Sequence, residues 1–316
     1  MAYRQGLSSD FVEALNRLYE APEGSWWRKM LADPDLFVAI RNNYLNIYYR
    51  GCSLAKVSFD GSGIITDTHY KYLLKPSAAR PYVRAVGGQF QIGQHWDSAK
   101  GLFIGGLDDV ADLKAAARVY AGEEKKFVGA VIKAHGNVVD VEMALTKDAE
   151  EATDASPGEG ASAKRIDIVA LRWEDAAPVL DFYEAKLFGN KEIRAEGDAK
   201  VLSQIAAYEG LLKQYTKDIR EGFELSCKNL LSLSGVPDLR RTIADAALQQ
   251  IDKLKINTAP ILIVSVFDED QRIGPVWAKH KEKLTTALSP DRLIARGSAS
   301  SVRLATGVAP GAAVSA

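Results

Sequence analysis

Two neighbouring apolar segments, residues 164–172 and 179–188, constrain the fold of this chain more than any other part. Both are rich in β-branched and aromatic residues, and the break between them, residues 174–178, carries a turn signal. The pattern predicts two antiparallel strands joined as a hairpin. If the loop is symmetric about the gap between positions 175 and 176, Asp167 lies opposite Glu184. Residues opposed in this way have Cα atoms roughly 4.5–5.5 Å apart.

The charges within these segments are unexpected in such apolar surroundings. Lys186 shares a face with Glu184, because side chains in a strand alternate between two faces. The flanking residues are typical of central strands in a covered sheet rather than of exposed edge strands. Charges inside such strands have a desolvation cost unless they are paired or bind a metal. The alternative is a solvated Asp167 and an ordinary surface ion pair between Glu184 and Lys186.

Composition limits the protein class. The chain has 316 residues, 47% of them hydrophobic and 26% charged, which is typical of a soluble globular protein with a sizeable core. A net charge of −1 gives no global basic field that would indicate nucleic-acid binding, although a local basic cleft is still allowed. Cys52 and Cys227 form no disulfide framework and no metal-ligand spacing, so we expect a reduced, cytoplasmic setting.

Membrane association is not expected from this sequence. The first ten residues lack the apolar core of a signal peptide, and no segment approaches the ~20 apolar residues that a membrane span needs.

Residues 1–106 are expected to form a smaller, accessory α+β domain. Ser9 or Asp10 can cap a helix that runs to about Tyr19. Apolar runs between positions 36 and 65, separated by glycine-containing turn signals, predict a small antiparallel meander. This domain could serve substrate choice, homo-oligomer assembly or a protein partner.

Residues 107–305 are expected to form a second, α/β domain, followed by a disordered tail at 306–316. Residues 147–163 have the composition of a flexible excursion. The expected elements of the second domain, in chain order, are helices over 107–120 and 123–135, a strand over 137–145, the hairpin, helices over 196–215 and 238–254, a buried strand over 260–267 and a helix over 277–288.

This order of elements, with Asp167 and the Glu-Ala-Lys run from Glu184 to Lys186, resembles the PD-(D/E)XK nuclease superfamily. Gln204 and Tyr208 on the following helix resemble the QxxxY motif of its RecB-type exonuclease branch, and their spacing places both on one helical face. The resemblance covers residues 107–290. The proline of the family's name is absent, because Arg165-Ile166 precedes Asp167.

The resemblance implies a restriction-endonuclease-like core, a mixed central sheet flanked by helices. It also implies Mg²⁺ or Mn²⁺ held by Asp167, Glu184 and the backbone carbonyl of Ala185, with Glu124 as a further metal ligand. The metal would polarise the scissile phosphate and activate the attacking water. Lys186 would orient that water or stabilise charge on the phosphate. Gln204 and Tyr208 would position the phosphate backbone or the metal-site residues.

Several assignments stay open at this stage. Glu123 fits the helix position of the extra metal ligand as well as Glu124 does, and Glu142 is a third candidate. Either helix residue can equally be a first-turn acid favoured by the helix dipole. Lys191, Arg194 and Lys200 could contact phosphates or be ordinary solvated charges.

The N-terminal residues between Arg41 and Arg50 mix tyrosines with basic side chains. Such a mixture can bind bases and phosphates, but at strand spacing the tyrosines are also typical of a core.

The expected function is therefore a metal-dependent deoxyribonuclease, a phosphodiester hydrolase of the kind used in phage defence or DNA repair. The alternative is a catalytically inactive nuclease-fold protein that binds nucleic acid or a protein partner. An unrelated α/β enzyme is a third possibility, which would place Gln204 and Tyr208 far from Glu184.

Overall fold

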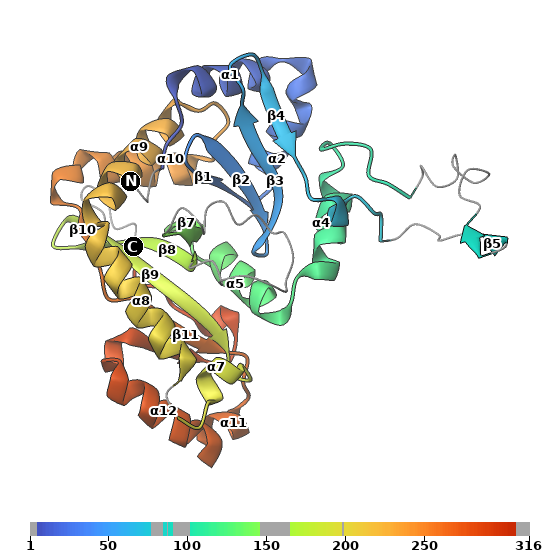
Figure 1. Ribbon diagram of the computed structural model, residues 1–316. Helices are drawn as coiled ribbons and strands as arrows, with labels where there is room; N and C mark the ends of the chain where they lie inside the picture. Colours follow the sequence, from blue (N-terminus) through green and yellow to red (C-terminus); the bar gives the residue numbers. More distant parts are fainter. Residues whose placement is uncertain are drawn as a thin grey trace, which may run out of the picture.

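The computed structural model describes residues 5–76, 85–86, 88–90, 102–145, 165–197 and 199–307. These residues form an α/β structure with one antiparallel four-stranded sheet and one mixed six-stranded sheet (Figure 1). None of the described helices is long and apolar enough to cross a membrane. The predicted flexible excursion at 147–163 and the chain beyond 307 lie outside the described residues.

The four-stranded sheet is the predicted meander. Its strands follow the sheet order β1-β2-β3-β4, and each pairs antiparallel with the next. Arg50 and Gly51 connect β2 to β3 with φ values of 49° and 68°, the positive range that a two-residue type I′ hairpin turn requires. The strands are β1 (Leu36–Ile40), β2 (Tyr44–Tyr49), β3 (Cys52–Phe59) and β4 (Ile64–Asp67).

Helices α1 (Ser9–Glu20) and α2 (Ser25–Ala32) pack with this sheet. The residue that caps α1 is Ser8, whose hydroxyl accepts from the backbone N–H of Phe11, so the helix starts one residue before the predicted range. Ser8 is preferred because its short side chain can reach that N–H group from extended backbone.

Helix α4 (Val110–Tyr120) belongs to the same core, although it lies beyond position 106. Leu113 and Ala117 are buried in the cluster that contains Leu54 and Val57 of β3. Packing of the N-terminal region therefore extends to the end of this helix.

The six-stranded sheet has the order β12-β11-β9-β8-β7, and β10 pairs with β9. The pairs β7–β8 and β8–β9 are antiparallel, whereas β9–β11 and β11–β12 are parallel, which confirms a mixed sheet. The strands are β7 (Val138–Ala144), β8 (Arg165–Glu174), β9 (Ala177–Leu187), β10 (Lys255–Ile256), β11 (Ile261–Ser265) and β12 (Leu293–Arg296).

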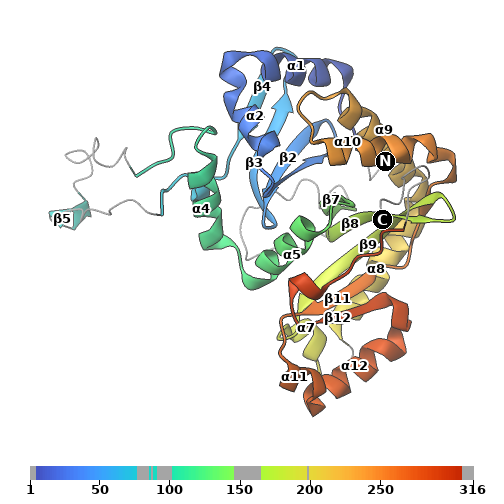
Figure 2. The ribbon, with the colours of Figure 1, turned by 180° about the vertical axis from the view of Figure 1, so that it is seen from behind.

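Helices cover both faces of this sheet (Figure 2). On one face, Val169 and Phe182 pack with Tyr208 and Phe223 of the following helices. On the other face, Ile168 and Tyr183 pack with the helix that precedes β7. The helices are α5 (Glu123–Ala134), α7 (Lys191–Arg194), α8 (Lys200–Gln214), α9 (Thr216–Ser232), α10 (Asp238–Gln249), α11 (Glu269–Ile273) and α12 (Pro275–Ala287).

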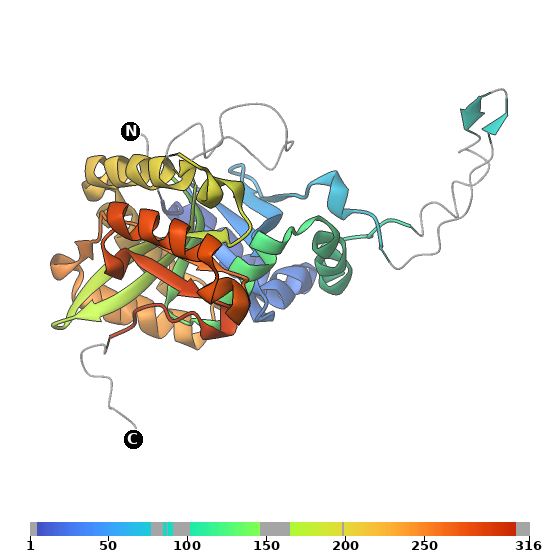
Figure 3. The same cartoon turned by 90° about the horizontal axis from the view of Figure 1, so that it is seen from below.

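Helices α8 and α12 share one core cluster beside β11 (Figure 3). Val201 and Ile205 of α8 pack with Trp277 and Leu284 of α12 in this cluster. The remaining elements are short: strands β5 (Ala85–Val86) and β6 (Gln89–Phe90), and the 3₁₀ turns Pro22–Gly24, Tyr70–Tyr72, Ile251–Lys253, Pro290–Arg292 and Ala299–Ser301.

Several predicted boundaries differ from the structure. Helix α8 starts at Lys200 rather than at 196, and α10 ends at Gln249 rather than at 254. Helix α9 and strand β12 were not predicted at all. At the predicted tail, the carbonyl of Thr306 still accepts a hydrogen bond from the backbone N–H of Trp173 at 2.7 Å.

Candidate active site

The hairpin of β8 and β9 has the predicted centre but a tighter turn. Only Asp175 and Ala176 form the loop, both with positive φ, and Glu174 already pairs with Ala177. The five-residue break was therefore too long, because the two strands continue to the edge of a two-residue turn. The paired register ends with Ile168 opposite Tyr183, and continuing it by one residue sets Asp167 against Glu184.

Glu184 is buried in the middle of the sheet, with 2% of its surface exposed. Its Oε1 atom accepts from Gln204 Nε2 at 2.8 Å and lies 2.7 Å from Lys186 Nζ. Its Oε2 atom is buried and has no hydrogen-bond partner among the described residues. A buried carboxylate oxygen without a donor is costly, so this site lacks one partner.

Asp167 faces the same point from the neighbouring strand. Its Oδ2 atom accepts from the backbone N–H of Ala185 at 2.7 Å. In an extended strand, the N–H and C=O of one residue point to the same side, so the carbonyl of Ala185 faces β8 as well. Ala185 itself is fully buried.

Lys186 is one cation shared by three carboxylates. Its Nζ atom lies 2.7 Å from Glu184, 3.4 Å from Glu192 and 3.8 Å from Glu124. Burial acts to lower the pKa of Lys186, but Glu184 and Glu124 outweigh it and raise that pKa. The ammonium group therefore stays protonated.

The two acids on the strands titrate far from their usual range. Burial, opposed by Lys186, raises the pKa of Glu184 to about 7. Burial and the charges of Glu184 and Glu142 raise the pKa of Asp167 well above its ordinary value. Burial, with the neighbouring acids as a smaller cause, thus disfavours the charged forms of both residues, as is common at functional sites.

Gln204 and Tyr208 lie where the predicted helical face puts them, against Glu184. Gln204 Nε2 also donates to the Tyr208 hydroxyl at 2.7 Å, and that hydroxyl donates to the carbonyl of Arg165 at 2.6 Å. The chain of contacts fixes the carboxyl group of Glu184 relative to β8. Gln204 and Tyr208 thus lie close to Glu184, whereas an unrelated α/β enzyme was expected to place them far from it.

Of the two acids at the start of helix α5, only Glu124 reaches the site. Its Oε2 atom accepts from Asn190 Nδ2 at 3.0 Å, and its other oxygen faces Lys186. Glu123 instead pairs with Lys126 at 2.7 Å, with a 69% exposed side chain. Asn190 was not predicted, although its position as the N-cap of α7, three residues after the end of β9, was a usable signal.

The other basic and aromatic candidates divide between surface and core. Lys191 and Lys200 are exposed near the end of β9. Arg194 donates to the carbonyl of Phe188 at 2.8 Å and stacks over its ring. In the N-terminal sheet, Arg41 and Tyr48 are buried, so they belong to the core and not to a free surface.

The residues of this site fit a divalent cation. Carboxylate oxygens are the ligands that Mg²⁺ and Mn²⁺ prefer, and Mg²⁺ keeps several waters, so two protein carboxylates can suffice. The orphaned Oε2 atom of Glu184 and the excess of negative charge are what a missing cation would correct. Within the described ranges, no three Asp, Glu, His or Cys side chains already converge as a ligand set.

Comparisons of the chain with protein-family models, curated proteins and solved structures find no match.

Proposed function

We propose that this protein is a metal-dependent nuclease with a PD-(D/E)XK-like core, which hydrolyses phosphodiester bonds in DNA with Mg²⁺ or Mn²⁺. The observation that carries this proposal is Glu184, which is buried beside Asp167 of the neighbouring strand, is paired with Lys186, and has one oxygen without a hydrogen-bond partner among the described residues. Lys186 and Gln204, both candidates from the sequence, each contact Glu184.

The arrangement of elements supports the same proposal. Helix α5, strand β7, the β8–β9 hairpin, helix α8 and strand β11 follow one another in the order expected for a restriction-endonuclease-like core. Fold alone does not imply function, so the site residues carry the proposal.

Asp167, Glu184 and the carbonyl of Ala185 would hold the metal, and Glu124 would approach it from helix α5. When bound, the metal would polarise the scissile phosphate and lower the pKa of the attacking water. Gln204 orients Glu184 through its 2.8 Å hydrogen bond. Lys186, which remains protonated, would stabilise the negative charge that develops on the phosphate.

The test is incubation of the purified chain with plasmid and linear DNA in Mg²⁺, Mn²⁺ or EDTA. We expect metal-dependent cleavage that falls by about 10²- to 10³-fold in Lys186→Ala, the usual scale for removing one charge-stabilising group. Glu184→Ala should be at least as damaging. Lys213→Ala, which removes an exposed lysine from helix α8, is the matched control and should retain activity.

Two results would count against the proposal in different ways. Cleavage that persists unchanged in Lys186→Ala and Glu184→Ala would reject this site. DNA binding without cleavage under any metal condition would support the inactive binding protein instead.

A further inference from the structure

Strand β7 brings a third acid next to the two carboxylates of the hairpin. The register pairs Val141 with Ile168 and Met143 with Ile166, so the intervening Glu142 lies opposite Asp167. Asp167 is in turn opposite Glu184. Three neighbouring strands thus carry one acid each in a single row across the sheet.

The backbone of Glu142 is unusual for a strand residue. Its φ is 50°, in the left-handed region that non-glycine residues rarely adopt. Such a conformation costs on the order of 1–3 kcal/mol and persists only where the surroundings impose it, most often at functional sites.

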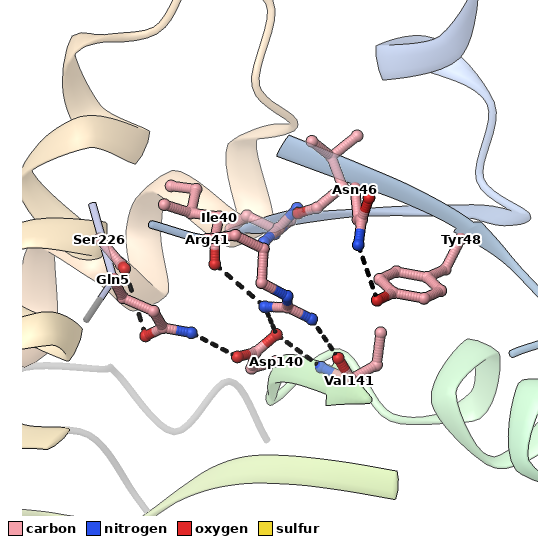
Figure 4. Close-up of polar contacts among 10 residues, drawn as sticks. Gln5, Ile40, Arg41, Asn46, Tyr48, Asp140, Val141 and Ser226 are labelled. Carbon is pink, nitrogen blue, oxygen red and sulfur yellow. Dashed lines mark hydrogen bonds and ion pairs between the residues drawn. The ribbon is translucent and has the colours of Figure 1, made fainter. Parts of the chain in front are cut away.

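Arg41, which directly follows strand β1 of the N-terminal sheet, binds the two residues that precede Glu142 (Figure 4). Its guanidinium group binds Asp140 Oδ1 at 2.7 Å and also donates to the carbonyl of Val141. Asp140 Oδ1 accepts from the backbone N–H of Val141 at 2.8 Å. Both backbone groups of the residue before Glu142 are therefore held by this ion pair, of which both members are buried.

The turn between β2 and β3 limits the side chain of Glu142 from the same direction. A Cβ atom added to Gly51 would lie 3.3 Å from Glu142 Oε1, so this turn approaches the carboxyl group closely. Two elements of the N-terminal sheet, Arg41 and the Gly51 turn, thus fix one acid of the row.

Glu184, in the same row of acids, provides a second observation. The Oε2 atom of Glu184 independently indicates a missing cation at the same site, because it is buried without a donor among the described residues.

We propose that Glu142 is a further carboxylate of the cation site, beside Asp167, Glu184 and Glu124, and that Arg41 is the positioning residue that holds it there. This inference rests on the proposed function, since it assumes that Asp167 and Glu184 bind Mg²⁺ or Mn²⁺. The N-terminal sheet would then have a defined role, because its residue Arg41 would hold one carboxylate of the metal site in place.

Calorimetric titration of the full chain with Mn²⁺ at pH 8, together with thermal unfolding of the metal-free protein, tests this inference. Glu142→Gln should weaken Mn²⁺ binding by about 10- to 100-fold, the scale for residues that support a metal site. It should not lower the melting temperature, because it removes a like charge beside Asp167. Glu142→Asn should also raise the melting temperature, because asparagine tolerates positive φ.

Two further variants complete the design. Glu174→Gln removes an acid from the turn end of the same hairpin and should change neither readout. Arg41→Lys should weaken Mn²⁺ binding in the wild-type background but not further in Glu142→Gln, because both changes act through the same carboxylate. A merely structural arginine would lower the melting temperature in both backgrounds without changing Mn²⁺ affinity.

The outcomes separate this inference from the proposed function. If the wild type binds Mn²⁺, Asp167→Asn abolishes binding and Glu142→Gln binds as the wild type does, only the role of Glu142 is rejected. If the wild type does not bind Mn²⁺ at all, both proposals are rejected.

Discussion

Two buried carboxylates on strand β9 differ in how completely they are paired. Asp181, 1% exposed, accepts from Arg172 Nε at 2.7 Å with one oxygen and from Asn257 Nδ2 at 2.8 Å with the other. Glu184, 2% exposed, has donors among the described residues for one oxygen only. The two residues lie on opposite faces of the same strand, three positions apart.

The difference indicates what each acid is for. A buried carboxylate whose two oxygens are both satisfied contributes to the structure, since removing it leaves its donors unpaired. A buried carboxylate with an oxygen that no donor satisfies is a destabilising group that a bound cation would stabilise. In this one hairpin, Asp181 is thus a structural acid and Glu184 belongs to the candidate site. Three predictions test this difference.

The largest expected effect is on stability. Asp181→Ala should lower the free energy of unfolding by about 3 kcal/mol, because it leaves Arg172 and Asn257 without their acceptor. Glu184→Gln, measured without metal at pH 8, should instead raise it by about 1 kcal/mol, because a poorly compensated buried charge is removed. Urea denaturation measures both. A loss of stability in Glu184→Gln equal to that in Asp181→Ala would remove the distinction.

The pH dependence of stability should report the ionisation of Glu184. The pKa of Glu184 is about 7 in the folded protein against 4.5 for an ordinary glutamate, so the folded state binds more protons between these values. The free energy of unfolding of the metal-free protein should therefore fall as the pH rises from about 4.5 to about 7, by up to about 3 kcal/mol.

Melting curves across this pH range measure that slope. Glu184→Gln should flatten it, whereas a conservative change at an exposed acid such as Glu221→Gln should not. Saturating Mn²⁺ should also flatten the slope, because the metal binds the deprotonated carboxylate. A wild-type slope that Glu184→Gln leaves intact would assign the titration to another group.

The smallest effect is expected for a change that keeps the carboxylate of Glu184 but removes a group that orients it. Gln204→Leu removes the hydrogen bond to Glu184 Oε1 and should weaken Mn²⁺ binding by about 10-fold, at the lower end of the range for groups that orient metal ligands. Lys213→Ala on the same helix is the control. Unchanged Mn²⁺ affinity in Gln204→Leu would mean that Lys186 alone orients Glu184.

Much of the candidate site could be predicted because it depends on local periodicity. The period of two in a strand and the symmetry of a short turn place Asp167 opposite Glu184. The helical period places Gln204 and Tyr208 on one face. Helix α9 was missed although Ile219, Phe223 and Cys227 follow a helical stripe, because it is rich in charges and only Tyr215 separates it from α8. Strand β12 has four residues, too few to show a period.

The sequence by itself therefore determined the hairpin, its register and the acids that face each other across it. Only the tertiary structure decided which other groups join them. Asn190 binds Glu124 from 66 residues away, and Arg41 binds Asp140 and Val141 from 99 and 100 residues away. No local period encodes such contacts, because the pairing of distant strands is selected by the packing of the whole sheet rather than by neighbouring residues.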